Sequence, residues 1–226
     1  RAAEGPGHAA LGRGLLALGE DAAAFFNLIL GYNYTYPMRE MIASPYRLRE
    51  AMLEKIGREA ENARQGLASG ITMKMNSLSD KEMIDALREA ARAGVKVRLM
   101  VRGICCLNYR ENPNLQIYSA VGRFLEHARV YSFENGGEKE VYLSSADLMP
   151  RNLDKRVELA TPVKDKRIRE QILSLLELGL MDNQKLWQLV HGNRYERVPR
   201  ALPAVNAQEE LLKSPNPLLD SQFLRG

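Results

Sequence analysis

The chain switches between two hydrophobic periods along most of its 226 residues. Apolar residues recur every four positions after Pro45, which predicts a long amphipathic helix ending near Gly66, with Ser44 as its N-cap. Between residues 95 and 101, apolar residues instead alternate with charged ones, the two-residue period of a strand. Such alternation of strands and helices predicts an α/β domain built on a mixed sheet.

The same periods and the turn residues between them predict the other elements. We expect strands at residues 71–75, 95–101, 116–119, 128–133, 141–144 and 157–162. We expect further helices at residues 20–30, 80–93, 166–178 and 181–190, a helical turn at 121–125, and Trp187 as an anchor on a helix face. Asn135-Gly136-Gly137 predicts a hairpin between two of the strands.

Three regions follow from this pattern. Residues 1–44 are expected to be a linker and a helix from the boundary of a preceding domain, with 1–14 poorly ordered and 32–44 a connector. Residues 45–196 form the predicted domain. Residues 197–226 contain four prolines and few residues that could pack, which predicts a flexible tail.

The amino-acid composition excludes few classes of protein. Hydrophobic residues make up 45% of the chain, charged residues 27%, and the net charge is +4, all ordinary for a globular domain. No apolar run approaches the roughly 20 residues that span a bilayer. The two cysteines, Cys105 and Cys106, are adjacent and poorly placed for a disulfide, so we expect a reduced, cytoplasmic protein in which they are small packing residues.

Candidate chemistry is concentrated between residues 122 and 158. His127 and Arg129 form an H-x-R pair, Glu134 follows seven residues after the histidine, and Ser145 and Asp147 follow the next predicted strand. This spacing is a degenerate copy of the phospholipase-D-type signature, H-x-K with an acid at plus seven and a downstream G-S-x-N. Residues two apart on a strand share a face, so an imidazole would lie beside a fixed cation, an arrangement suited to phosphoryl transfer.

Three further segments make the resemblance specific. They read K-M-N-S-L-S-D from residue 74, A-G-V from residue 93 leading into V-R-G-I-C-C-L from residue 101, and S-A-D from residue 145 leading into R-V-E from residue 156. In this order they resemble the C-terminal part of bacterial polyphosphate kinase of the long-chain-synthesising type, from about Phe26 to about Tyr195. The resemblance implies a phospholipase-D-like mixed sheet flanked by helices, with extra N- and C-terminal helices.

The resemblance also implies an activity. That family transfers the terminal phosphate of ATP reversibly to polyphosphate through a phosphohistidine, which lies in a preceding domain in an H-x-K setting. His8 and His191 lack that setting, so the chain is expected to be a C-terminal fragment that is inactive alone. Implied partners are ATP or ADP, polyphosphate and the rest of the kinase chain, in a homo-oligomer and without nucleic acid. Mg²⁺ is expected to be bound largely outside this chain, and a peripheral membrane association stays open.

Residue roles follow from the resemblance. His127 is the expected catalytic residue, although a lone histidine in such a position is more often a packed one. The expected ATP- and phosphate-binding residues are Arg102, His127, Arg156, Arg151 and Lys74. The expected supporting residues are Arg129, Glu134, Ser145, Asp147 and Asn76, and none is expected to bind a metal.

Two other functions remain open at this point. One is a half-site of a nuclease or lipid hydrolase of the phospholipase D superfamily, completed by dimerisation. The other is a non-catalytic module that binds polyanions. Arg129 in place of lysine and Asp147 in place of asparagine argue against the hydrolases.

Overall fold

The computed structural model describes residues 6–31, 38–108 and 112–213, and its centre is a nine-stranded mixed sheet of order β1-β7-β6-β5-β2-β3-β4-β8-β9. The strands are β1 (Ile42–Ser44), β2 (Gly70–Met75), β3 (Lys96–Val101), β4 (Leu115–Ala120), β5 (Arg129–Phe133), β6 (Glu140–Ser144), β7 (Glu158–Pro162), β8 (Leu186–His191) and β9 (Arg194–Arg197). The helices are α1 (Pro6–Ile29), α2 (Leu48–Arg64), α3 (Lys81–Arg92), α4 (Pro150–Asp154), α5 (Lys166–Met181) and α6 (Ala207–Lys213), with a 3₁₀ turn at Asn135–Gly137.

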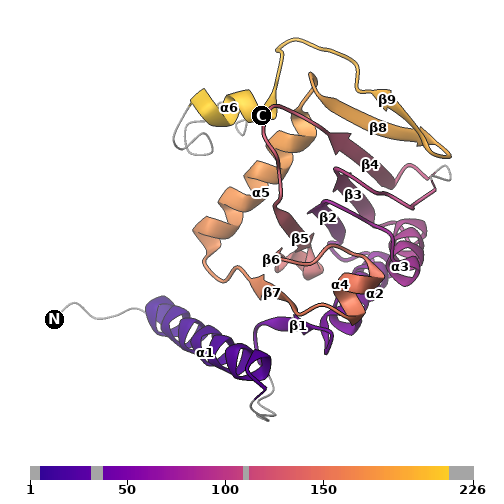
Figure 1. The fold of residues 1–226 in the computed structure, drawn as a ribbon. Helices are drawn as coiled ribbons and strands as arrows, with labels where there is room; N and C mark the ends of the chain where they lie inside the picture. The colour runs from indigo at the N-terminus through magenta and orange to yellow at the C-terminus, as the bar shows by residue number, and fades with distance from the viewer. Residues whose placement is uncertain (1–5, 32–37, 109–111, 214–226) are drawn as a thin grey trace.

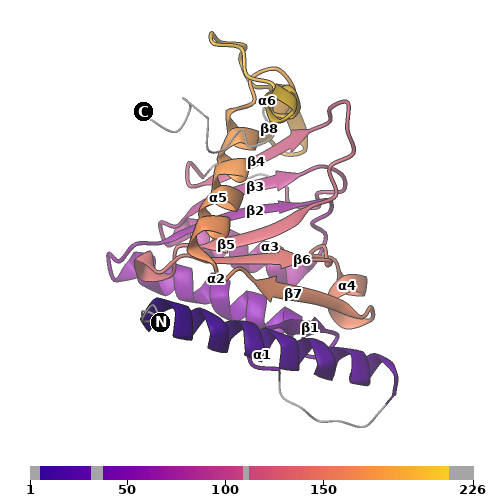
Figure 2. The ribbon, with the colours of Figure 1, turned by 90° about the vertical axis from the view of Figure 1, so that its left-hand side faces the viewer.

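Helices cover both faces of the sheet. Helices α2 and α3 lie on one face and α5 crosses the other (Figures 1 and 2). The larger core lies under α2 and α3, and includes Met52, Leu87 and Leu99. On the opposite face, a smaller cluster packs Leu176 of α5 against the sheet, where Met100 of β3 contributes. The predicted fold class, a mixed α/β sheet flanked by helices with extra terminal helices, is confirmed.

Strand directions bring several chain segments to one edge of the sheet. Strands β2, β3 and β4 are parallel, β5 runs antiparallel beside β2, and β6 and β7 continue the antiparallel order. The carboxyl ends of β2, β3 and β6 therefore lie at the same edge as the amino ends of β5 and β7. Helix α4, which connects β6 to β7, also lies at this edge (Figure 2).

The start of α2 differs from the prediction. Arg47 rather than Ser44 is the N-cap residue, and the helix begins at Leu48. Ser44 instead ends β1, where its hydroxyl donates to the carbonyl oxygens of Asn152 and Leu153. The hydroxyl therefore holds the edge strand against α4 rather than capping a helix.

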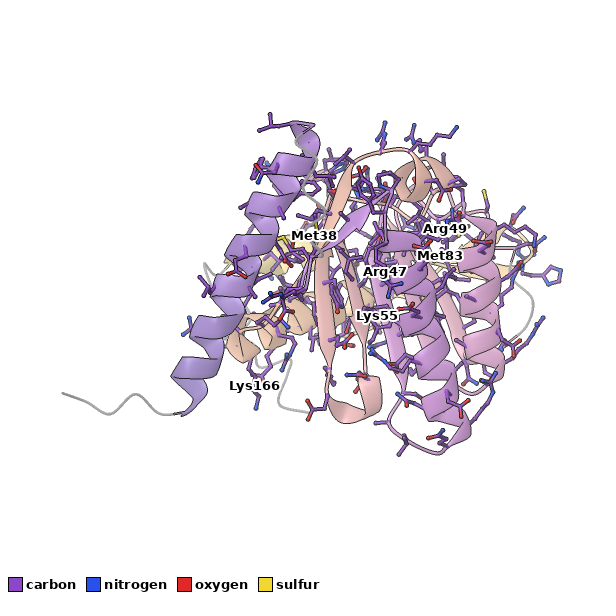
Figure 3. The ribbon with its side chains drawn as sticks, turned by 90° about the horizontal axis from the view of Figure 1, so that it is seen from below. Met38, Arg47, Arg49, Lys55, Met83 and Lys166 are labelled. Carbon is purple, nitrogen blue, oxygen red and sulfur yellow. The ribbon has the colours of Figure 1, made fainter. Side chains whose placement is uncertain are left out.

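Helices α2 and α3 lie side by side and are joined by a polar contact at their N-terminal ends (Figure 3). Arg49 of α2 donates to Asp80 at 2.7 Å, and Asp80 in turn caps α3 by accepting from the backbone N–H of Met83 at 3.1 Å. Arg49 also donates to Asp154 at 2.7 Å. One guanidinium therefore links α2 to the start of α3 and to the end of α4.

The predicted helix at residues 181–190 is wrong. Helix α5 continues to Met181, and Leu186–His191 forms β8, paired antiparallel with β4. The segment pairs its backbone with the edge of β4 instead of forming a helix, so tertiary context outweighs local propensity here. Trp187 therefore lies on a strand, with its ring 5.3 Å from the Arg197 guanidinium, and His191 ends that strand.

The two ends of the chain carry more structure than the pattern indicated. Helix α1 begins at Pro6, inside the segment 1–14 that was expected to be poorly ordered. Ile42–Ser44 is a strand, whereas the other part of the predicted connector, 32–37, lies outside the described residues. In the predicted tail, α6 forms and Val205 is buried, while 214–226 lies outside the described residues.

Smaller differences concern loops and cysteines. The helical turn expected at 121–125 is an irregular loop, and α4 was not predicted. The hairpin at Asn135–Gly137 is confirmed, with Gly136 and Gly137 at positive φ. Cys105 packs against the core, but Cys106 is exposed, so its predicted packing role is wrong. Among the described residues, no helix has the length and apolar character needed to cross a membrane.

A buried carboxylate on α2 gives a test of the fold. Glu59 is fully buried and accepts from the backbone N–H of Gly70 at 2.9 Å and of Asn135 at 2.7 Å. Glu59→Ala should lower the free energy of unfolding by about 2–3 kcal/mol, because both N–H groups lose a charged acceptor in a buried setting.

Urea unfolding followed by circular dichroism measures this loss. Glu61→Ala, on the exposed side of the same helix, is the matched control and should change stability by about 0.5 kcal/mol or less. Equal losses for the two variants would contradict the role of Glu59.

Candidate functional site

Asn76 brings His127 and Arg102 together at the sheet edge described above. It follows β2 directly and is buried. Its side-chain oxygen accepts from Arg102 Nε at 3.0 Å, and its side-chain nitrogen lies 3.4 Å from His127 Nδ1. Arg102 follows β3 and His127 precedes β5, so one amide joins the ends of three adjacent strands.

This arrangement favours one tautomer of His127. Arg102 Nε can only donate, so the Asn76 oxygen must face it and the Asn76 amide hydrogens face the imidazole. His127 Nδ1 then acts as the acceptor, which leaves the proton on Nε2. An Nε2–H group on this exposed side chain is free to donate to a phosphate oxygen.

Gly103 is required by the close approach of two chain segments. Its backbone N–H donates to the carbonyl oxygen of Asn76 at 2.8 Å. A Cβ atom at this position would meet that same oxygen at 3.0 Å, closer than ordinary packing allows. The glycine therefore lets the segment after β3 lie against the segment after β2, which is what brings Arg102 to Asn76.

Arg129 and Asp147 form a two-point ion pair beside this group. Arg129 Nε and Nη2 donate to the two carboxylate oxygens of Asp147 at 3.2 and 3.0 Å. Asp147 also accepts from the backbone N–H groups of Asn76 at 2.7 Å and Ser77 at 3.1 Å. Both members of the pair are largely buried, so Arg129 is a supporting cation rather than an open anion site.

Lys74 and Glu126 form a second ion pair, on the face of the sheet that α5 covers. Burial alone would raise the pKa of the Glu126 carboxyl, but hydrogen bonds from Lys74 and Gln208 outweigh it and lower the pKa. Lys74 is therefore neutralised by a carboxylate. It lies where a phosphate-binding residue was predicted, but its charge is already compensated.

Arg151 and Arg156 lie at the same edge, in the connection between β6 and β7. The backbone N–H of Arg156 donates to the carbonyl oxygen of Arg151 at 2.9 Å, and both side chains are exposed. Next to them, buried Glu158 accepts from Ser145 Oγ and, at 2.6 Å, from Asn152 Nδ2. Ser145 is therefore used in holding the start of β7 to the end of β6.

The cations of the edge fall into two groups. Lys74 and Arg129 are paired with carboxylates. Arg102, Arg151 and Arg156 form no ion pair with any carboxylate of residues 6–31, 38–108 and 112–213. Three arginines without an ion-pair partner among the described residues, at one sheet edge, can bind a multiply charged anion.

One predicted site residue lies elsewhere. Glu134 follows the far end of β5, where its backbone N–H bonds to Gly70 and its carboxylate pairs with Lys139 at 3.0 Å. The plus-seven spacing carries it the full length of the strand, because each strand residue advances the chain by about 3.3 Å. The prediction that Glu134 supports this site is wrong.

Three residues of the site were not predicted. Glu126 directly precedes His127 and Glu158 ends the R-V-E motif, so their positions in the sequence were a usable signal. Gln208 has no such signal, because it lies 82 residues from Glu126 in the proline-containing tail. Its contact becomes apparent only when α6 is seen to lie near the loop before β5.

The carboxylates of the site do not fit Mg²⁺. Asp147, Glu126 and Glu158 each already accept hydrogen bonds from two or more N–H or O–H donors. Among the described residues, no group of three His, Cys, Asp or Glu side chains is arranged to hold a metal ion. A magnesium ion associated with nucleotide phosphates would need ligands other than these.

A cavity of about 320 Å³ lies beside Lys74, Arg102 and Glu126, between the sheet and helices α5 and α6. Apart from those three residues its lining is mostly apolar, with Met100 and Leu211 among the contributors. The polar site therefore has an apolar side, on the face that α5 covers.

The chain is similar in sequence to known polyphosphate kinases. The chain is 42% identical over 200 residues to a polyphosphate kinase of Staphylococcus haemolyticus, covering 87% of this chain and 28% of the relative. It is 43% identical over 199 residues to a polyphosphate kinase of Rhodopirellula baltica, covering 86% of this chain and 23% of the relative. The chain thus spans less than a third of the length of these relatives.

A solved structure and a family model agree with these relatives. The crystal structure of polyphosphate kinase from Porphyromonas gingivalis aligns with a TM-score of 0.82 at 35% identity, over 85% of this chain and 30% of that chain. The family model described as polyphosphate kinase C-terminal domain 2 matches residues 41–208, which include every site residue described above. The chain therefore belongs to the polyphosphate kinase C-terminal domain family.

Proposed function

We propose that this chain supplies one half of the active site of a polyphosphate kinase. The complete enzyme would transfer the terminal phosphoryl group of ATP reversibly to polyphosphate, through a phosphohistidine in a preceding domain. The observation that carries the proposal is the Asn76 amide, which holds His127 and Arg102 together at the same sheet edge as Arg151 and Arg156. Family membership supplies the substrate class.

Each chemical step would involve charge that these residues can stabilise. A histidine nitrogen of the preceding domain attacks the γ-phosphorus, the bond from the bridging oxygen to that phosphorus breaks, and ADP leaves. A terminal oxygen of polyphosphate then attacks the phosphohistidine phosphorus and the P–N bond breaks. In both steps negative charge spreads over phosphate oxygens, which preorganised donors stabilise.

Separate roles follow for the site residues. His127 donates its Nε2 proton or hydrogen bond to an oxygen of the transferring or leaving phosphate. Arg102 binds nucleotide phosphate through its Nη groups, because Nε is held by Asn76. Arg156 and Arg151 bind further along the phosphate chain. Lys74, whose ammonium is paired with Glu126, acts mainly by positioning its neighbours.

The ion pair between Arg129 and Asp147 argues against the hydrolase alternative. In the H-x-K signature of the phospholipase D type, the lysine is available to contact phosphate. Here the equivalent cation is bound at two points by a buried carboxylate. The histidine is therefore left without the free neighbouring cation that phosphodiester hydrolysis would use.

The wider biochemical setting belongs to the same proposal. Substrates are ATP or ADP and polyphosphate, with Mg²⁺ bound to the phosphates and held by groups outside the carboxylates described above. The chain acts with the rest of a longer kinase chain, in a homo-oligomer without nucleic acid, in the cytoplasm. Peripheral association with a membrane would be compatible with this setting.

Replacing His127 tests the catalytic assignment. In the full-length protein, His127→Ala should lower turnover of ATP into polyphosphate by about 100-fold or more, the usual scale for a positioned acid or base. Stability should change little, because the side chain is exposed. His191→Ala is the matched control, since His191 is also exposed but ends β8 at the opposite edge of the sheet, and it should leave turnover unchanged.

Two results would overturn the assignment. One is a loss of thermal stability with normal activity of the folded fraction, the pattern of a packing histidine. The other is hydrolysis of a phosphodiester substrate in a parallel assay, with no turnover of ATP and polyphosphate, which would favour the hydrolase reading.

The 226-residue chain by itself gives another test. It should not synthesise polyphosphate from ATP, because the proposed covalent intermediate needs a histidine that belongs to a preceding domain. Adding the preceding portion of the full-length protein should restore growth of the polymer, measured by incorporation of radiolabelled phosphate into acid-insoluble material. Synthesis by the rigorously purified chain alone would contradict the divided active site.

A further inference from the structure

The loop that carries His127 has little packing of its own. Residues 121–128 form no regular structure, and Val121, Phe124 and Leu125 have exposed fractions of 70%, 45% and 73%. Apolar burial therefore does not fix the path of this loop. Polar contacts must do so if His127 is to be held in one position.

One side chain from the far end of the chain makes several of these contacts. Gln208 of α6 accepts from the backbone N–H of Phe124 at 2.9 Å and donates to its carbonyl oxygen at 3.0 Å. It also donates to a carboxylate oxygen of Glu126 at 2.7 Å. The Gln208 amide thus binds the loop through its oxygen and its nitrogen at two residues, Phe124 and Glu126. Glu126 directly precedes His127.

Helix α6 is itself fixed to the domain, so Gln208 is a firm attachment. The backbone N–H of Ala207 donates to the buried carboxylate of Asp182 at 3.0 Å. The side-chain oxygen of Asn183 accepts from the backbone N–H of Val205 at 3.0 Å. Asp182 and Asn183 directly follow α5, which crosses the sheet (Figure 1).

Gly122, at the start of the loop, also faces the Gln208 amide. A Cβ atom at this position would lie 2.4 to 2.8 Å from the side-chain amide atoms of Gln208. These are the nearest atoms to that position, so the absence of a side chain at 122 leaves room for the Gln208 amide. The sequence therefore accommodates Gln208 at the start of the loop and binds it in the middle.

We propose that Gln208 is a positioning residue for His127, and that α6 sets the catalytic geometry from outside the sheet. The contact runs from α6 through Phe124 and Glu126 to His127, while Lys74 holds Glu126 from β2. Gln208 itself touches no reacting atom. This inference rests on the proposed function of His127, and its test contains an arm that does not depend on that function.

The test compares variants of the full-length protein. Gln208→Ala removes the amide, and Gln208→Glu keeps its size but removes both donors and sets a carboxylate against Glu126. Gly122→Ala displaces the Gln208 amide without changing it. Glu209→Ala, exposed on the same helix, is the matched control.

The first measurement is hydrogen exchange, which needs no activity. The Phe124 amide should exchange faster by about 10-fold or more in Gln208→Ala, because its acceptor is lost, and at the wild-type rate in Glu209→Ala. Carbethoxylation of His127 by diethyl pyrocarbonate, followed by peptide mass spectrometry, should also change in rate. Unchanged exchange and unchanged His127 reactivity would overturn the proposal.

The second measurement is turnover. Gln208→Ala and Gln208→Glu should lower kcat by about 10-fold or more, with a smaller change in KM for ATP, because a displaced histidine weakens the transition state more than ground-state binding. Faster exchange at Phe124 with normal kcat would overturn the positioning role. If the wild-type protein fails to make polyphosphate, the proposed function fails, and exchange and His127 reactivity still decide whether Gln208 holds the loop.

The double variant separates a local role from general damage. Gly122→Ala should lower kcat in the wild-type background and have little further effect in Gln208→Ala, because the group it displaces is already gone. Additive losses would mean that the two residues act independently, and would overturn the proposed contact.

Discussion

The carboxylate of Asp147 joins three strands at the edge where the proposed chemistry takes place. It follows β6, accepts from the backbone N–H groups of Asn76 and Ser77 after β2, and binds Arg129 at the start of β5. Hydrogen bonds to a charged group contribute about 1.5–3 kcal/mol each, so this junction is strong as well as central. Asn76 can present its amide to His127 and Arg102 only because its own backbone is held there.

The same junction explains two departures from the phospholipase-D-type signature. Arg129 stands where that signature has lysine, and Asp147 stands where it has asparagine. Taken separately, each looks like a loss of function. In the structure the two side chains bind each other, so a cation that could contact phosphate and an uncharged amide have become a structural ion pair. In the proposed site the charge for binding phosphate would then come from Arg102, Arg151 and Arg156, which form no ion pair with a described carboxylate.

How far the sequence predicts the structure depends on how local the determining interactions are. The strands from β2 to β7 were predicted to within two residues, because each has an apolar period and a turn residue beside it. The segment around Trp187 was predicted as a helix because its pairing with β4, nearly 70 residues earlier, leaves no trace in local periodicity. The motif residues Asn76, Arg102 and His127 lie at one edge, because the ends of parallel and antiparallel strands meet there. The seven-residue spacing of Glu134 was misleading for the opposite reason: along a strand it spans the sheet.

The role of Gln208 could not be predicted from sequence motifs. Its amide matters because of where α6 rests, and α6 rests there because Asp182 and Asn183 bind the chain after it has left the sheet. None of these residues belongs to a motif, and the family model ends at residue 208. A hydrophobic core does not order the exposed loop that carries His127, so its order has to come from polar side chains of other elements. The geometry of His127 therefore depends both on the strand ends that the sequence pattern reveals and on a helix that only the folded chain brings to it.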